Sequence, residues 1–338
     1  MQEPFPALTR LSLETKDDTA PIIPDTLLGG FAPKLESLWL SIPIPSPVLR
    51  KLLLSHDNLV DLSLLKILHP EHLSPEAMVT CLSVLTRLEY LDFGFKFRRS
   101  RPYRENRHPP PPTRTLLPAL RHLLVTGVSE YLEDLVARID APLLDTLNVT
   151  FFQQLIFDTP QFAQFISRCG CGQKDEAHNE ARVIFYDSRV TVSLPGRFTH
   201  AVRLGISCRQ SDWQLSAVAQ VCSSSFFQAF IHTVEHLYIL EGTSKPCWQD
   251  DIENSQWLEL LHPFTGVKKL FLSHKFETRI APALQELVGE RVDEVLPALQ
   301  SIFWEEFHPS GVVPEGIGQF ATVRHLSGHP IVVSPWKT

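Results

Sequence analysis

The feature that most constrains this chain is a short apolar phrase that recurs along it. In residues 117–125 (LPALRHLLV) the phrase places apolar side chains at Leu120, Leu123 and Val125. The last two are two residues apart, so on a strand both point to one face, and the first lies one bend earlier. Each copy therefore predicts a short strand that contributes to a common core.

The repetition of this phrase predicts the architecture. Other copies begin at Leu8, Leu35, Leu59, Leu88, Leu144, Ala201, Val234, Val267 and Leu299, and Val323 and Leu326 form a weak last echo. Such spacing is a leucine-rich-repeat signature. Between copies the apolar period becomes helical, as in 74–85, where Ser74 is a potential N-cap before Pro75. We expect an α/β fold, an irregular leucine-rich-repeat solenoid with a curved parallel sheet inside and helices outside, forming one domain over 1–338.

One interval departs from the repeat. About twice the usual length separates Leu144 from Ala201, and it contains the β-prone runs 181–186 and 189–194, joined by Asp187 and Ser188. We predict an irregular repeat with a hairpin-like insertion within 150–200.

Composition excludes several classes of protein. The net charge of −7 is too mild to indicate nucleic-acid or anionic-membrane binding, and no apolar run is long enough to span a membrane. The N-terminus lacks the pattern of a signal peptide, and the six cysteines are scattered, as in reduced proteins. We expect a cytoplasmic or nuclear protein.

The segment 96–115 inverts the local charge. It carries seven Lys and Arg residues, one acidic residue and four consecutive prolines. Clustered arginines can serve nuclear import or bind an acidic partner, but the same composition is typical of a solvated, disordered insertion.

Few residues indicate catalysis or metal binding. Cys169, Cys171 and His178 could suggest a metal site, although structural zinc takes four ligands, so a reduced thiol pair is the simpler interpretation. The sequence contains no nucleophile elbow and no phosphate loop. We predict a non-enzymatic protein without a cofactor.

The repeat geometry indicates where a partner would bind. Residues two and four places after each first apolar position should face the inner, concave surface of the arc. Aromatic and basic side chains gather in these columns, as in protein-binding hot spots. The predicted protein-binding residues are Trp39, Tyr90, His122, Arg203, His236, Tyr238, Lys269, Phe271 and Phe303. Alternatively, loops or a C-terminal tail carrying Trp336 cover some of these rings.

Several longer phrases are more specific than a generic repeat. Residues 128–144 (VSEYLEDLVARIDAPLL), 157–161 (FDTPQ), 205–208 (GISC), 257–261 (WLELL) and 283–287 (ALQEL) resemble the repeat region of fungal F-box proteins from mushrooms. The resemblance implies repeats that recruit a substrate to a cullin-type ubiquitin ligase. In that family an F-box before the repeats binds the Skp adaptor. No F-box is visible before the first repeat, so adaptor binding is expected only if one lies upstream. The alternative is a truncated paralogue that folds but recruits nothing.

Overall fold

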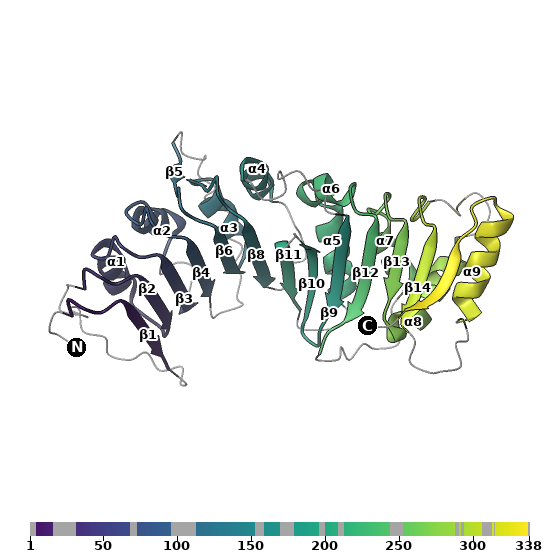
Figure 1. The fold of residues 1–338 in the computed structure, drawn as a ribbon, viewed down its shortest axis with the longest axis horizontal. Helices are drawn as coiled ribbons and strands as arrows, with labels where there is room; N and C mark the ends of the chain where they lie inside the picture. The colour runs from purple at the N-terminus through teal and green to yellow at the C-terminus, as the bar shows by residue number, and fades with distance from the viewer. Residues whose placement is uncertain are drawn as a thin grey trace. The chain divides into compact units, whose positions relative to one another are not determined.

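Strand–turn–helix units make up the protein, as a computed structural model shows (Figure 1). The structure describes residues 5–15, 32–67, 73–95, 113–152, 159–169, 179–195, 200–208, 213–243, 253–287, 291, 294–305, 313 and 315–336. Internal contacts divide the chain into a first unit, residues 1–152 and 159–171, and a second unit, residues 153–158 and 172–338. The prediction of one continuous domain over 1–338 stays a prediction.

The first unit contains one parallel sheet and a row of helices. Its strands pair in the order β1, β2, β3, β4, β6, β8. They are β1 (Arg10–Glu14), β2 (Ser37–Ser41), β3 (Asp61–Ile67), β4 (Tyr90–Phe95), β6 (His122–Gly127) and β8 (Thr146–Phe152). The helices are α1 (Ser46–Leu54), α2 (Pro75–Leu82), α3 (Ser129–Val136) and α4 (Pro160–Arg168). A small second sheet pairs β5 (Thr115–Leu116) with β7 (Ile139–Asp140).

The second unit has a mixed sheet. Its strands are β9 (Glu180–Phe185), β10 (Arg189–Pro195), β11 (His200–Ser207), β12 (His236–Glu241), β13 (Lys269–Leu272), β14 (Ser301–Glu305) and β15 (Val332–Trp336). They pair in the order β11, β10, β9, β12, β13, β14, β15. Its helices are α5 (Trp213–Ser223), α6 (Ser225–Ile231), α7 (Asn254–Leu261), α8 (His274–Gln285) and α9 (Glu315–Leu326). Only β10 is antiparallel to its neighbours, so β9 and β10 form the hairpin that the sequence predicts.

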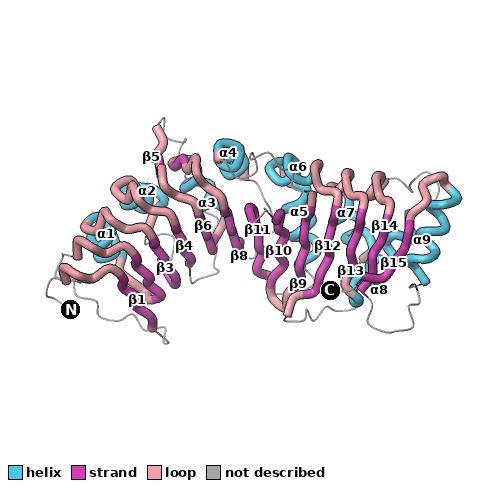
Figure 2. Tube along the Cα trace, viewed as in Figure 1, coloured by secondary structure: helices cyan, strands magenta, loops and turns pink. Residues whose placement is uncertain are grey.

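The recurring phrase forms the core as predicted. Leu38, Leu62, Leu91, Leu123 and Leu147 are aligned in register on neighbouring strands and are at most 1% exposed. The preceding leucines of the phrase, such as Leu59 and Leu120, are fully buried. The helices cover this side of each sheet, and Figure 2 shows strands and helices as separate layers. Each unit therefore has the α/β leucine-rich-repeat fold, and the opposite side of its sheet, here called the open face, carries no helix among the described residues.

One backbone pattern sets the register at most junctions. In the first unit the carbonyl of Glu36 accepts hydrogen bonds from the amides of Val60 (2.8 Å) and Asp61 (2.9 Å). The carbonyls of Val60, Glu89 and Arg121 repeat this for the next strands, and in the second unit those of Asn179, Glu235 and Lys268 do the same. Each strand thus begins at a fixed offset from its neighbour.

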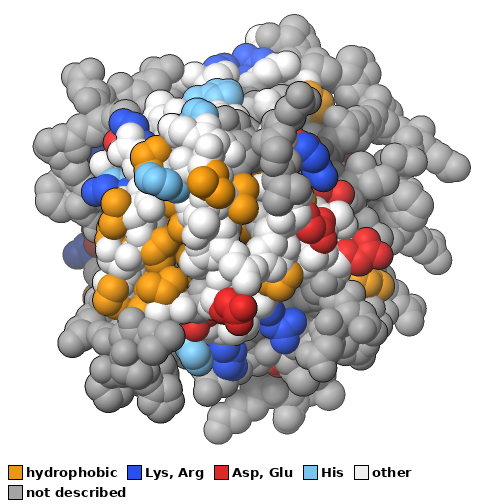
Figure 3. Space-filling model, turned by 90° about the vertical axis from the view of Figure 1, so that its right-hand side faces the viewer, with side chains coloured by type: hydrophobic (Ala, Val, Ile, Leu, Met, Phe, Trp, Pro, Cys, Tyr) orange, Lys and Arg blue, Asp and Glu red, His pale blue; other side chains and the backbone are white. Residues whose placement is uncertain are grey.

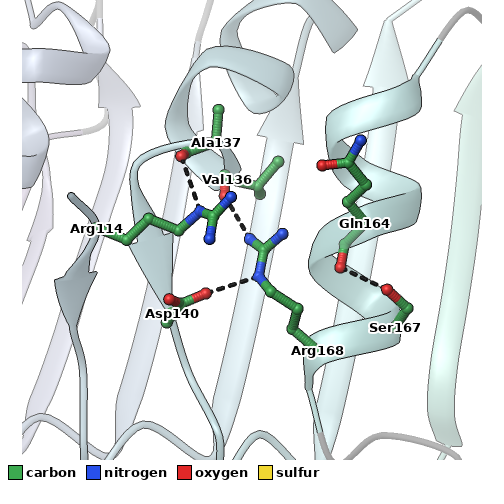
Figure 4. A network of polar contacts seen from close by, with 7 residues as sticks. All are labelled: Arg114, Val136, Ala137, Asp140, Gln164, Ser167 and Arg168. Carbon is green, nitrogen blue, oxygen red and sulfur yellow. Dashed lines mark hydrogen bonds and ion pairs between the residues drawn. The ribbon is translucent and has the colours of Figure 1, made fainter. Parts of the chain in front are cut away.

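Polar side chains hold α4 in the first unit. The buried Glu133 carboxylate accepts hydrogen bonds from the amides of Gln161 (2.9 Å) and Phe162 (2.8 Å) in the first turn of α4. At the other end of the helix, Arg168 pairs with Asp140 (2.7 Å) and donates to the Val136 carbonyl (3.3 Å), as Figure 4 shows. Both ends of α4 are therefore tied to the α3–β7 segment.

The C-terminal end corrects one prediction. Val323 and Leu326 lie in α9, because their spacing of three fits a helix as well as a strand. The last strand is β15, whose Pro335 has no N–H. The Val332 amide donates to the Gln300 carbonyl, so the nitrogen of Val332 points toward β14. Backbone nitrogens of successive residues point alternately to the two edges of a strand, so the nitrogen of Pro335, three residues later, points to the edge away from β14. A proline there limits the addition of another strand.

The predicted helices are largely present. Ser74 caps α2 by accepting a hydrogen bond from the Ala77 amide at 3.2 Å. Helix α8 begins at His274 and continues through Pro282. None of the helices in the described ranges is long and apolar enough to cross a membrane. The basic segment falls mainly outside the described residues, which resume at Thr113.

Gly266 gives a test of the repeat junction before β13. An added Cβ would lie 2.9 Å from the His232 carbonyl oxygen and 3.2 Å from that of Val234. Since backbone cannot give way easily, Gly266→Ala should lower the free energy of unfolding by about 1–3 kcal/mol in urea denaturation.

Gly318 in α9 is the matched control, because an added Cβ would meet only a Val313 methyl carbon at 3.8 Å. Gly318→Ala should leave stability unchanged or raise it by up to about 1 kcal/mol. Equal effects of the two substitutions would contradict the close approach at Gly266.

Candidate functional site

Four side chains align across the open face of the second unit. Strand pairing places Arg182 of β9 beside Tyr238 of β12, Tyr238 beside Phe271 of β13, and Phe271 beside Phe303 of β14. The core-facing neighbours Val183, Ile239 and Leu272 are fully buried, so these four residues face the opposite side.

The three aromatic rings form a cross-strand stack, here called the aromatic ladder (Tyr238, Phe271 and Phe303). The ring centroids of Tyr238 and Phe271 are 4.2 Å apart with an interplanar angle of 7°, and those of Phe271 and Phe303 are 4.6 Å apart at 11°. These separations approach the distance between paired strands, about 4.8 Å. All three side chains are half-buried, so their outer edges remain accessible.

Two further side chains, Arg182 and Trp336, contact the rings of the ladder. The Arg182 guanidinium lies 5.4 Å from the Tyr238 ring centroid, and its Nε donates to Glu180 at 2.5 Å. Trp336 of β15 packs edge-on against Tyr238 (6.0 Å) and Phe271 (5.5 Å) and donates its indole N–H to the Leu272 carbonyl at 3.3 Å. The alternative that the tail covers part of this surface is therefore realised for Tyr238 and Phe271.

A second register row runs beside the ladder. It contains Glu180, His236, Lys269 and Ser301 on the same four strands. Partial burial and the neighbouring Lys269 lower the pKa of His236 below its ordinary value. Burial, and then the Glu180 charge, raise the pKa of Tyr238. Near neutral pH this row therefore presents an uncharged imidazole beside the Lys269 ammonium.

Arg203 lies on the open face but not beside the ladder. It belongs to β11, and Ser193 of β10 and Arg182 of β9 lie between it and Tyr238. Arg203 also joins the register row of the ladder and not that of His236, and it donates to the Tyr186 hydroxyl at 3.4 Å. The antiparallel hairpin separates Arg203 from β12. Arg182, which the prediction missed, lies beside the ladder instead, and the alternation of polar and apolar residues in 180–183 was the available signal.

The remaining predicted residues lie on the open face of the first unit. Tyr90 and His122 are neighbours in one row, with ring centroids 6.0 Å apart and an interplanar angle of 46°. Trp39 lies in the adjacent row, followed by Ser63 and Asp92 on the next two strands. Trp39, Tyr90 and His122 thus share the open face with Asp92, which was not among the predicted binding residues.

Asp92 is the most perturbed carboxylate on this face. Burial raises its pKa from 3.8 to about 6. The Asp92 and Asp61 charges in turn add to the burial that raises the pKa of Tyr90. No Lys, Arg or His in the described part of the chain forms an ion pair with Asp92.

The proposed thiol pair is described only in part. Cys169 is buried, whereas Cys171 and His178 lie outside the described residues. Among the residues that the structure describes, no three His, Cys, Asp or Glu side chains are arranged to hold a metal ion.

Apolar side chains are also exposed at the C-terminal end of the second unit. Leu326 is 81% and Val332 62% exposed. Seen from the side where α9 and β15 lie in Figure 1, apolar side chains form separate patches with acidic and basic side chains between them (Figure 3). This end is therefore mixed in character, in contrast to the continuous ladder.

Comparisons with known proteins add a structural likeness. No protein-family model matches the sequence, and no curated protein matches it. Among solved structures, the chain is similar to the leucine-rich-repeat-containing protein LegL7 from Legionella pneumophila, at 13% sequence identity and a TM-score of 0.35, over 95% of this chain and 91% of that one. The fold assignment made above depends on the strand pairing and the helix layer of this chain itself.

The raised pKa of Asp92 predicts that this residue lowers the free energy of unfolding in a pH-dependent way. The folded carboxyl binds its proton more tightly than the unfolded one, so Asp92 lowers stability as pH rises from about 4 to about 6, and the penalty persists above that range. At pH 7, Asp92→Asn should be more stable than wild type by about 1 kcal/mol, after allowance for solvent screening. The difference should disappear near pH 4 in urea denaturation.

The exposed Asp57 lies outside the open face and supplies the control. Asp57→Asn, a substitution of an exposed side chain, should change the free energy of unfolding at pH 7 by no more than about 0.5 kcal/mol. A destabilised Asp92→Asn protein at pH 7 would mean that the carboxylate has a stabilising partner.

Proposed function

We propose that this protein is a non-enzymatic interaction scaffold and that the aromatic ladder, with Arg182, His236 and Lys269 beside it, binds a protein partner. The observation that carries the proposal is the stack of three half-buried rings on the face of the sheet opposite the helices.

The energetic support comes from what the ladder offers a partner. Rings already stacked against each other lose little side-chain entropy when a partner binds. Their half-buried edges can release further apolar surface from water, at about 25 cal/mol per Å². Tyr and Arg dominate protein-binding hot spots, and Lys269 and Arg182 add orientation through charge.

A protein suits this surface better than a nucleic acid does. Stacked rings with basic neighbours can also bind single-stranded nucleic acid. However, Arg182 is already paired with Glu180, and the whole chain carries a net charge of −7. A polyanion would therefore gain little from long-range attraction.

The F-box resemblance extends the proposal. If an F-box lies upstream of this polypeptide, the ladder would recruit a substrate to a cullin-type ubiquitin ligase through the Skp adaptor. Co-purification of the adaptor with the product of the complete transcript tests this extension. If the adaptor co-purifies neither with the product of the complete transcript nor with the present chain, the ligase extension is wrong. The proposal that the ladder binds a protein partner is not affected by that result.

The alternative is a truncated paralogue in which the ladder is purely structural. The contacts of Trp336 with Tyr238 and Phe271 favour that alternative, because they use part of the surface internally. The two functions differ in whether the ladder is needed for stability or for binding.

The test replaces two rings of the ladder. A photo-reactive benzoylphenylalanine at position 303 should crosslink a specific protein in cell extract. Adding Tyr238→Ala and Phe271→Ala should reduce the crosslinked yield by at least about 100-fold, because two hot-spot rings that each contribute about 2 kcal/mol together account for up to about 1,000-fold in binding. Quantitative mass spectrometry measures the yield, and circular dichroism checks the fold.

Trp213 on α5 provides the matched control, since it is an exposed aromatic residue (42%) on a helix and not on the open face. Trp213→Ala should leave the crosslinked yield unchanged. If the ladder substitutions unfold the protein while yield per folded molecule stays constant, the structural alternative is correct.

A further inference from the structure

The open face of the first unit contains a second group of side chains with a different character. On strands β2, β3 and β4, one register row reads Trp39, Ser63, Asp92, and the next reads Ser37, Asp61, Tyr90. The small Ser63 thus lies between an indole and a carboxylate.

The Asp92 carboxylate is partly buried, and no described residue compensates for the water contacts that it has lost. Its carboxylate forms no hydrogen bond and no ion pair with any described residue. By contrast, Glu180 on the open face of the second unit is paired with Arg182, and Glu235 with Lys268. A partly desolvated charge without a partner is costly, and an opposite charge supplied from outside would recover that cost.

The Ser63 hydroxyl is an independent observation at the same place. Ser63 is 9% exposed, so about nine-tenths of it is buried, and its hydroxyl, which is not among the fully buried oxygen atoms, forms no hydrogen bond with a described residue. Strand register directs it to the same face as Trp39 and Asp92. A hydroxyl in that position can accept a hydrogen bond from a ligand N–H.

Two aromatic side chains flank this space. The Trp39 ring has no aromatic contact with a described residue, and the ring contact of Tyr90 within the described part of the chain is with His122, on the side away from β3. Indole and phenol faces attract cations, and a planar guanidinium can stack on them.

We propose that Trp39, Ser63, Asp61, Asp92 and Tyr90 form a binding site for an arginine side chain of a partner protein. The guanidinium would stack on Trp39, donate to the Asp92 carboxylate and to the Ser63 hydroxyl, and gain from the Asp61 charge. Arginine fits better than lysine because its planar fork supplies several donors and a stacking surface at once. A metal ion fits less well, because no group of three metal-binding side chains occurs here among the described residues.

This site does not depend on the aromatic ladder, because its residues belong to the other unit. Failure of one proposal therefore leaves the other intact. The Tyr238→Ala, Phe271→Ala protein should bind the arginine probe as wild type does, which separates the two tests.

The probe is a capped, fluorescently labelled peptide, Gly-Ser-Arg-Gly-Ser-Arg-Gly, and the measurement is fluorescence anisotropy with the full chain at physiological salt. Matched peptides carry lysine or citrulline in place of arginine. The arginine peptide should bind, the lysine peptide should bind more weakly, and the uncharged citrulline peptide should not bind. Asp92→Asn should weaken arginine-peptide binding at least about tenfold, as expected for loss of a charge-assisted hydrogen bond.

Two further variants make the result specific. Asp57→Asn removes the same charge elsewhere on the first unit and should leave binding unchanged. Trp39→Leu should weaken the arginine peptide more than the lysine peptide, because only the guanidinium stacks on the ring. Since Asp92→Asn is expected to stabilise the fold at pH 7, its loss of binding cannot come from unfolding. Equal losses for Asp57→Asn and Asp92→Asn, or no binding by the wild-type protein, would overturn the proposal.

Discussion

A carbonyl that serves two amides determines the register on which both open faces depend. In the first unit one backbone carbonyl accepts hydrogen bonds from two consecutive amides at the start of the next strand, and this holds for the carbonyls of Glu36, Val60, Glu89 and Arg121. The carbonyls of Asn179, Glu235 and Lys268 do the same in the second unit. These backbone hydrogen bonds set the offset between neighbouring strands at the junctions. Since side chains alternate along a strand, a shift of one residue would exchange core and open face.

Because neighbouring strands keep a constant register, residues at equivalent positions of the repeats lie side by side in rows across each sheet. In the second unit it aligns Tyr238, Phe271 and Phe303 closely enough for their rings to stack, and it places Arg182 at one end. In the first unit it puts the small Ser63 between Trp39 and Asp92, a carboxylate without an ion-pair partner among the described residues. One fold therefore presents an apolar, basic surface on one unit and an acidic, aromatic one on the other.

The sequence was sufficient for the core and for most of the ladder. Leucines two residues apart on a strand must share a face, so Tyr238, Phe271 and Phe303 could be assigned to the open face directly. The separation of Arg203 from the ladder could not be predicted, because the pattern does not encode that β9 and β10 lie between β11 and β12. Nor does local spacing distinguish a strand from the helix that holds Val323 and Leu326. The contact of Trp336 with Phe271 joins residues distant in sequence, and burial of Asp92 depends on its neighbours, so neither follows from periodicity.

The central claim is that register, interrupted by the hairpin, assembles the ladder with Arg182 beside it. Nuclear Overhauser contacts in protein labelled at its Tyr, Phe and Arg side chains test this directly. The account predicts contacts between the Tyr238 and Phe271 rings, between the Phe271 and Phe303 rings, and between Arg182 and Tyr238, with none between Arg203 and Tyr238. A contact between Arg203 and Tyr238, or none among the three rings, would contradict it.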